Sequence, residues 1–195
     1  MSDTPRVIEA GLRSFVCAYE HYAEEPFHLG DMVAVREGAV VVLGVIADAQ
    51  SGPEDPTRPL QSRGGPGQTA ADVMAANPEI RLLLRTRVTV VSCGYFQSET
   101  PRAALPPTPP PLLARVEAAT VDETIRLADD GAFLALLASA PPPCDDAVIA
   151  ASIRGAARAF GGGSHDFTVR AGKELARLLK AEPSRLTSIL RGVAR

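Results

Sequence analysis

The chain has 195 residues, of which 46% are hydrophobic and 22% charged, and none is Trp. This composition is typical of a globular protein and excludes a disordered chain. A formal net charge of −3 gives no reason to expect a nucleic-acid or membrane partner. The charge is uneven, however, with a balance of −7 over residues 1–140 and +4 over residues 141–195. This asymmetry indicates either two differently charged solvated surfaces or a basic segment that meets an acidic partner or a phosphate backbone.

Three features predict a cytoplasmic protein with no membrane partner. Cys17, Cys93 and Cys144 are odd in number and far apart, which favours a reducing compartment over a disulfide framework. The first residues lack the apolar stretch of a signal peptide. No run approaches the roughly 18 apolar residues of a transmembrane helix.

The first part of the chain predicts strands. An alternating apolar pattern covers residues 13–22, and Gly30-Asp31 forms a turn that leads into residues 32–36. Glu37-Gly38 predicts the tip of a hairpin, after which residues 39–47 are apolar throughout and therefore predict a buried strand. Gly44 within that run indicates a bulge or a bend.

The middle of the chain combines a loop, two short helices and a strong strand. Residues 51–68 are rich in Pro and Gly and predict a long loop. A short helix follows over residues 69–76, and Asn77-Pro78 predicts the N-cap and first turn of another over residues 79–84. The β-branched run over residues 85–96 predicts the clearest strand.

A proline-rich segment separates the strands from the helices. Residues 105–112 contain five prolines, which remove amide donors and predict an extended crossover outside any sheet; an SH3-type ligand is the alternative interpretation. A short strand over residues 113–118 comes next. A capping-box pattern at Thr120 and Glu123 then opens a helical region, with further helices over residues 145–160, 164–182 and from Pro183 onward.

These pieces, in this order, resemble the HAS barrel. They are the Gly-Asp turn into residues 32–36, the apolar run 39–46, the strand 87–96 with its Gly-Tyr-Phe ending, and the proline crossover 105–111. The HAS barrel is a small domain shared by HerA-type translocases and the catalytic heads of rotary ATP synthases. The resemblance implies an α+β fold in which a small closed β-barrel of about six strands, over residues 1–118, precedes a C-terminal bundle of three or four helices over residues 119–195.

The resemblance also implies a function. The chain has no ATPase core after the barrel and is instead similar to stand-alone HAS-barrel proteins of cyanobacteria with a helical tail. Barrels of this family support ring assembly and dock a nuclease partner, so the resemblance implies a non-enzymatic adaptor. It would dock on a protein partner such as an ATPase ring or a nuclease-type complex, with homo-oligomers also open.

The residues themselves predict no catalytic, cofactor-binding or metal-binding site. The run from Arg170 to Glu174 departs from a phosphate-binding loop in its glycines and its hydroxyl. His21 and His28 flank Glu24 and Glu25, a grouping more typical of a solvated acidic surface than of a metal site. Adjacent aspartates at residues 129–130 and 145–146 point apart on a helix and do not form a catalytic pair.

An alternative function is DNA binding through residues 170–195. The segment from Glu174 to Leu190 partly matches a helix-turn-helix, with Ala176 as the small residue at the helix crossing. Arg185, Ser188 and Arg191 would then contact phosphates or bases, or a protein partner. Antiparallel helix pairs of this spacing are common, so a purely structural interpretation is favoured over it.

Overall fold

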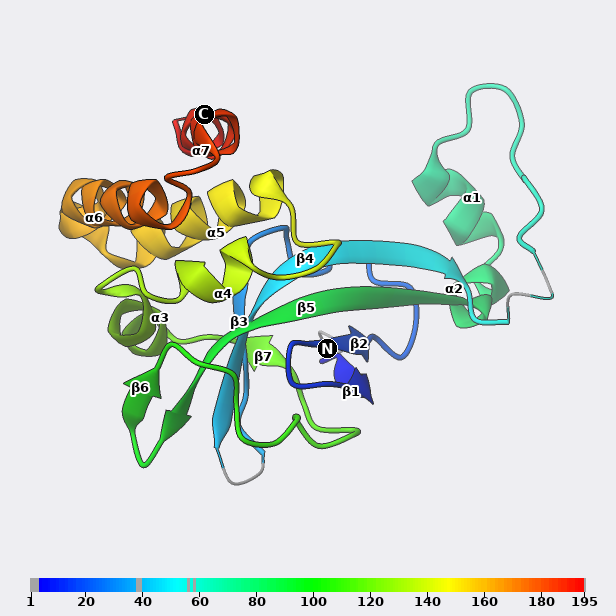
Figure 1. The fold of residues 1–195 in the computed structure, drawn as a ribbon. Coiled ribbons are helices and arrows are strands. Elements are labelled where there is room, and N and C mark those ends of the chain that lie inside the picture. Colours follow the sequence, from blue (N-terminus) through cyan, green and yellow to red (C-terminus); the bar gives the residue numbers. More distant parts are fainter. Residues whose placement is uncertain (1–3, 38–39, 56, 58, 195) are drawn as a thin grey trace.

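The computed structural model describes residues 4–37, 40–55, 57 and 59–194 and has an α+β fold (Figure 1). The strands are β1 (Arg6–Ala10), β2 (Ser14–Ala18), β3 (Met32–Val35), β4 (Val41–Pro53), β5 (Leu84–Gln97), β6 (Thr100–Arg102) and β7 (Glu117–Ala118). The helices are α1 (Ala70–Ala76), α2 (Glu79–Leu83), α3 (Val121–Ala128), α4 (Leu134–Ala138), α5 (Asp146–Ala159), α6 (Ser164–Leu178) and α7 (Pro183–Val193), with a 3₁₀ turn over Gly161–Gly163.

The strands form one antiparallel sheet, and the predicted closed barrel of about six strands is wrong. The sheet has seven strands in the order β1-β2-β5-β4-β3-β7, with β6 paired to β5, and it is open. Between β1 and the segment before β7, Arg6 and Arg115 form an isolated bridge. Val7 exchanges backbone hydrogen bonds with Leu113 and Ala114, and Val116 N donates to Pro5 O, but no continuous ladder forms.

The chain before β7 explains why no continuous ladder closes the sheet. Its prolines have no amide donors, and Leu113 has a left-handed φ of +65°, which breaks an extended conformation. The predicted strand over residues 113–118 is accordingly reduced to the two residues of β7.

The two long strands confirm the strongest sequence predictions. Residues 42–47 are buried, and the pairing of β4 with β5 shifts between Leu43 and Gly44, as the predicted bulge requires. A Cβ on Gly44 would lie 2.4 Å from Cγ1 of Val90, so only glycine fits there. β4 also continues through residues 51–53, which the sequence assigns to a loop, because these residues pair with residues 84–86. The predicted hairpin tip at Gly38 lies outside the described residues.

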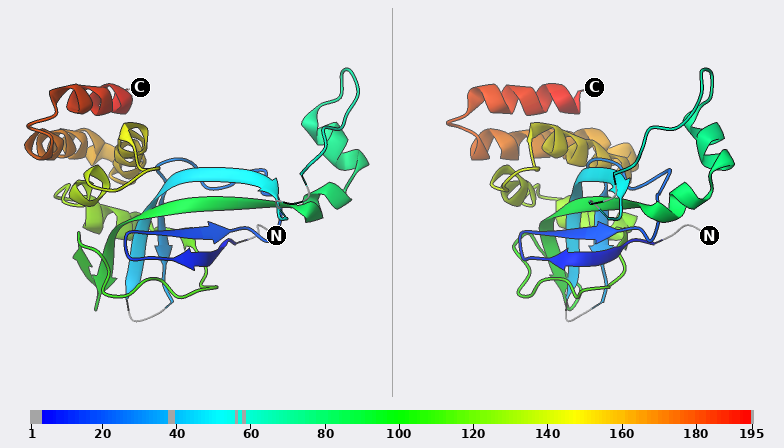
Figure 2. Two further views of the ribbon diagram at one scale, coloured as in Figure 1. Left: turned by 45° about the vertical axis from the view of Figure 1, so that its right-hand side comes forward. Right: turned by 90° about the vertical axis from the view of Figure 1, so that its right-hand side faces the viewer.

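The helices α3 to α7 lie together on one side of the sheet (Figure 2). The larger core cluster joins both layers: it contains Leu43 and Val45 of β4 and Val91 and Cys93 of β5 together with buried residues of all five helices. A second cluster, which includes Phe15, Ile46 and Val90, consists mainly of strand residues and contains no residue of α3–α7. The last strand, β7, ends at Ala118 and α3 begins at Val121, and the larger core cluster extends across this point.

The helix ends follow local sequence signals in most places. Thr120 caps α3 in the predicted capping box, and Asp145 accepts hydrogen bonds from Ala147 N and Val148 N at the start of α5. Asn77 is different: its side chain donates to Val73 O and ends α1, whereas Pro78 occupies the N-cap of α2. The prediction of Asn77 as an N-cap is therefore wrong.

Arg36 joins the end of β3 to β7 and α3. Its guanidinium donates to Glu117 at 2.6 Å and to Glu123 at 2.7 Å and 3.2 Å. Burial would raise the pKa of Glu123, but hydrogen bonds from Arg36 and Thr120 outweigh that effect and lower its pKa. A carboxylate with a lowered folded-state pKa stabilises the fold above its unfolded pKa, and this contribution is lost as the pH falls through the folded pKa.

We expect Glu123→Ala to reduce the free energy of unfolding by about 1–2 kcal/mol at pH 7, because a hydrogen-bonded charge and an N3 cap are both removed. Glu123→Gln keeps the hydrogen bond of the cap and removes only the charge, so its free energy of unfolding should fall by less than that of Glu123→Ala. Urea unfolding at pH 7 and at about pH 3 measures the effect, since the ordinary Glu pKa is about 4.3. The difference in free energy of unfolding between Glu123→Gln and the parent chain should shrink at the lower pH. If it is the same at both pH values, the charge of Glu123 does not stabilise the fold.

Candidate functional site

A projecting arm is the candidate functional site. It comprises the outer halves of β4 and β5 and the residues between these strands, with α1 and α2 at its end. In Figures 1 and 2 the arm projects lengthwise from the end of β4 and β5 that lies farthest from α3 and α6. The register from Asp48↔Thr89 to Pro53↔Leu84 is unbroken, so the base of the arm is a regular pair of antiparallel strands.

The two arm helices are locally well formed but bury almost nothing. Thr69 and Asp72 form a reciprocal capping box at the start of α1, and the hydrogen bonds to Asp72 lower its pKa. α1 nevertheless has no buried residue, and α2 buries only Ile80. Helices of seven and five residues are marginal in water without tertiary packing. The arm therefore has little core of its own.

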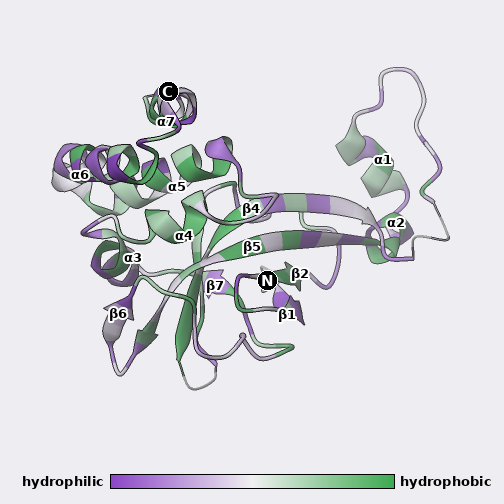
Figure 3. Ribbon diagram, viewed as in Figure 1, coloured by the Kyte–Doolittle hydropathy of each residue, from purple (hydrophilic) through white to green (hydrophobic). Residues whose placement is uncertain are grey.

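Large apolar side chains of the arm face solvent. Leu60 is 51% exposed, and Leu82 and Leu83 of α2 are each 59% exposed. Figure 3 shows hydrophobic residues on both short helices. Exposed apolar side chains that cluster in this way are typical of protein-interaction sites.

A pocket lies between the start of the loop and α2. It has a volume of about 420 Å³, and its apolar lining residues are Pro53, Pro59, Leu60, Ile80, Leu83 and Leu84. A second hollow shares Leu60 and Ile80 with it and reaches Val73 and Met74 of α1. The exposed leucines at the end of the hairpin are therefore continuous with the apolar lining of a pocket.

Charged residues on the arm pair with one another or with the body of the protein. Arg85 bonds to Glu54 at 2.6 Å, and Arg63 lies 3.7 Å from Glu79. Arg81 forms an ion pair with Glu24 of the loop before β3. Of these three pairs, only the exposed pair of Arg81 and Glu24 links the arm to the rest of the protein. The other two pairs partly neutralise Glu54 and Glu79, which line the pocket.

The predicted contact residues lie elsewhere, on α7. Arg185 donates to Asp146 at 2.8 Å and to Ala138 O at 3.2 Å, and the hydrogen bond to Asp146 raises its pKa. Arg185 thereby attaches α7 to the beginning of α5. Ser188 and Arg191 line a hollow between α5 and α7. The structure therefore places Ser188 and Arg191 at one hollow, whereas the side chain of Arg185 is engaged in hydrogen bonds within the protein.

The predicted helix crossing at Ala176 is not formed. Ala176 is exposed on α6, and the buried residue Ile189 of α7 belongs to the larger core cluster with α5. The exposed basic residues here are Arg170, Lys173 and Arg177 of α6 and Lys180, which follows the helix. Two of these already bond to acids, Arg170 to Asp129 and Arg177 to Glu174. DNA binding by residues 170–195 stays a prediction.

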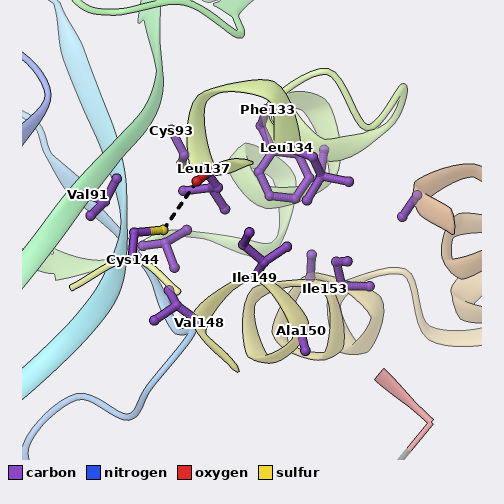
Figure 4. Packing of buried hydrophobic residues seen from close by; sticks show 14 of the residues in the cluster. Val91, Cys93, Phe133, Leu134, Leu137, Cys144, Val148, Ile149, Ala150 and Ile153 are labelled. Carbon is purple, nitrogen blue, oxygen red and sulfur yellow. Dashed lines mark hydrogen bonds between the residues drawn. The ribbon is translucent and has the colours of Figure 1, made fainter. Parts of the chain in front are cut away.

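The cysteines are all buried free thiols. Burial raises the pKa of Cys17 to about 12 and that of Cys144 to about 11, and it raises the pKa of Cys93 as well. Cys144 donates to Leu137 O at 3.5 Å in the larger core cluster, near Cys93 (Figure 4). Since a thiolate is the reactive form, these thiols are inert core residues.

Within the described part of the chain, no group of three or more His, Cys, Asp or Glu side chains is placed to hold a metal ion. His28 lies 3.5 Å from Asp31 and is exposed. Among the same residues, no helix combines the length and apolar character needed to cross a membrane. No protein-family model matches the sequence, and a search of curated proteins found no match to it.

Proposed function

We propose that this protein is an interaction module that docks on a partner protein through the arm. The observation that carries the proposal is the exposure of three leucines on the arm. Leu60 and Leu83 line the pocket, Leu82 is the neighbour of Leu83 on α2, and the two arm helices bury almost nothing. Covering these side chains would supply the packing that the arm lacks. The free thiols favour the cytoplasm as the place where this happens.

The docking role can be tested by removing the arm leucines. We expect Leu82→Ser combined with Leu83→Ser to weaken partner binding by at least about tenfold, because burying a leucine contributes about 1.5–3 kcal/mol. The measurement is quantitative affinity purification from the native cell, followed by titration of the recovered protein against both chains. Both leucines are mostly exposed, so thermal unfolding should be nearly unchanged.

A matched control uses exposed leucines outside the arm. Leu12 and Leu112 are 42% and 61% exposed, and Leu12→Ser combined with Leu112→Ser should leave partner binding intact. If the arm variant binds the same proteins as strongly as the parent chain does, the arm is not the docking surface and the proposed function is wrong.

A further inference from the structure

One edge of β4 is paired over only part of its length. On the side away from β5, β3 pairs with β4 from Met32↔Val45 to Val35↔Val42. Two backbone hydrogen bonds extend this pairing to Ile46, from Gly30 N to Ile46 O and from Ile46 N to Asp31 O. Beyond Ile46, the described residues provide no backbone partner on this side. The unpaired edge therefore runs over residues 48–53.

The register shows which backbone groups point outward from this edge. Glu54 N donates to Leu83 O at 2.9 Å, which places residues 54 and 83 in a hydrogen-bonded pair. Because such pairs alternate in an antiparallel ladder, Gly52 and Gln50 also bond to β5. The backbone groups of Ala49, Ser51 and Pro53 therefore face away from β5.

The opposite side of β5 agrees with this assignment. Tyr19 N donates to Thr86 O at 3.0 Å, so Thr86, the residue opposite Ser51, turns its backbone toward the segment after β2. Since Pro53 has no N–H, the edge offers two amide donors, at Ala49 and Ser51, and three carbonyl acceptors. The side chains of Ala49, Gln50 and Ser51 are exposed, so this edge is accessible.

The unpaired edge leads directly into the arm pocket. Pro53 is the last residue of β4 and lines the pocket, together with Glu54, Leu60 and Leu83. A chain paired along residues 48–53 would bring one of its side chains to this apolar hollow. The two observations, unpaired backbone and adjacent pocket, are independent of each other.

We infer that the edge of β4 binds an extended segment of the partner by strand addition, with a large apolar side chain of that segment in the arm pocket. The inference rests on the proposed docking function and names the chemistry of the partner. In this mode of recognition, main-chain hydrogen bonds provide affinity and a pocket for a side chain provides specificity. Alternating donors and acceptors at strand spacing are complementary to another extended backbone.

The test uses linear 12-residue peptides, selected from a displayed library against the full-length chain and then synthesised. Ala49→Pro removes one outward donor without removing a bond to β5, and proline is tolerated at such edge positions. We expect it to weaken peptide binding, measured by calorimetry, by about tenfold. Ala49→Ser keeps the N–H and should bind like the parent chain.

A second measurement does not depend on how the variant folds. N-methylation of the selected peptide should abolish binding at alternate residues and leave it unchanged at the residues between them, because only every second amide faces the edge. Hydrogen exchange should show that the Ala49 and Ser51 amides become protected in the complex. Selected peptides should carry a large apolar residue and bind less tightly to the chain with Leu83→Ser.

The outcomes separate this inference from the proposed function. Peptides that require Leu82 and Leu83 but tolerate Ala49→Pro and every N-methylation would overturn strand addition and leave docking through the arm intact. Binding insensitive to both the leucines and Ala49 would overturn both. A selection that yields no peptide bound at the arm counts against the inference. A dimer that Ala49→Pro dissociates, measured by light scattering, would show that a second copy occupies the edge.

Discussion

Phe133→Ala should reduce the free energy of unfolding by about 3–5 kcal/mol, the range expected when a buried phenylalanine is truncated. Phe133 is fully buried immediately before α4, in the larger core cluster. Figure 4 shows it beside Leu134, within the layer of side chains that separates α4 from α5. The truncation leaves a cavity that rigid neighbours fill only partly, and that cavity accounts for much of the cost.

The same variant tests whether strands and helices unfold together. Because the cluster includes Val45 and Val91 of the sheet as well as Ile149 of α5, amides of β4, β5 and α5 should lose hydrogen-exchange protection by the same amount. Phe133→Leu fills most of the space and should show a clearly smaller loss. Loss of protection in the helices alone would show that residues 119–195 form an independent domain and contradict a shared core.

Local signals in the sequence predicted the elements well because the relevant contacts are a few residues apart. The capping box at Thr120 and Glu123 begins α3, Asp145 begins α5, and Pro183 begins α7. The bulge at Gly44 was also predictable, since a glycine inside an apolar strand indicates a close approach of neighbouring atoms. The three helix starts depend on contacts within a few residues. Gly44 is the exception, because the atoms closest to it belong to Val90 and Val91 of β5, and the glycine itself is the local sign of that approach.

Contacts between distant segments explain the errors. Ser51, Gly52 and Pro53 have poor strand propensity, and they are in β4 because residues 84–86 pair with them. The closed barrel required a ladder between β1 and the segment before β7, and strand patterns alone do not show whether two edges meet. The sequence gives no sign that Arg185 bonds within the protein, because its partner Asp146 is 39 residues away.

The candidate site was missed for a related reason. The Pro and Gly content predicts a long loop over residues 51–68, but the length of a loop does not show where its apolar side chains lie. The sequence does contain one signal: three of the five residues of α2, Ile80, Leu82 and Leu83, are large and apolar, and Leu84 follows directly. So short a helix cannot bury apolar side chains on all its faces, which indicates that some of them face solvent or a partner.

Gly30→Ala should destabilise the protein by about 2–5 kcal/mol, because two costs act at one position. Gly30 has φ = +83°, a left-handed conformation that costs a residue with a Cβ roughly 1–2 kcal/mol. In addition, a Cβ there would lie 2.4 Å from the carbonyl carbon of Ala151 and 2.6 Å from Ser152 N, both in the backbone of α5. Gly30 N also bonds to Ile46 O, so the turn cannot move away without breaking its link to β4.

Gly67→Ala is the matched control for the backbone cost alone. Gly67 has nearly the same φ, +84°, but a Cβ there would meet no atom within 4 Å. We expect a loss of about 1–2 kcal/mol or less for this variant, since alanine also lowers the entropy of the unfolded chain. The difference between the two variants, measured by urea unfolding, then isolates the steric cost of separating α5 from the sheet. If the two variants lose the same free energy of unfolding, α5 can move away from the new Cβ at little cost, and the close contact at Gly30 does not contribute to stability.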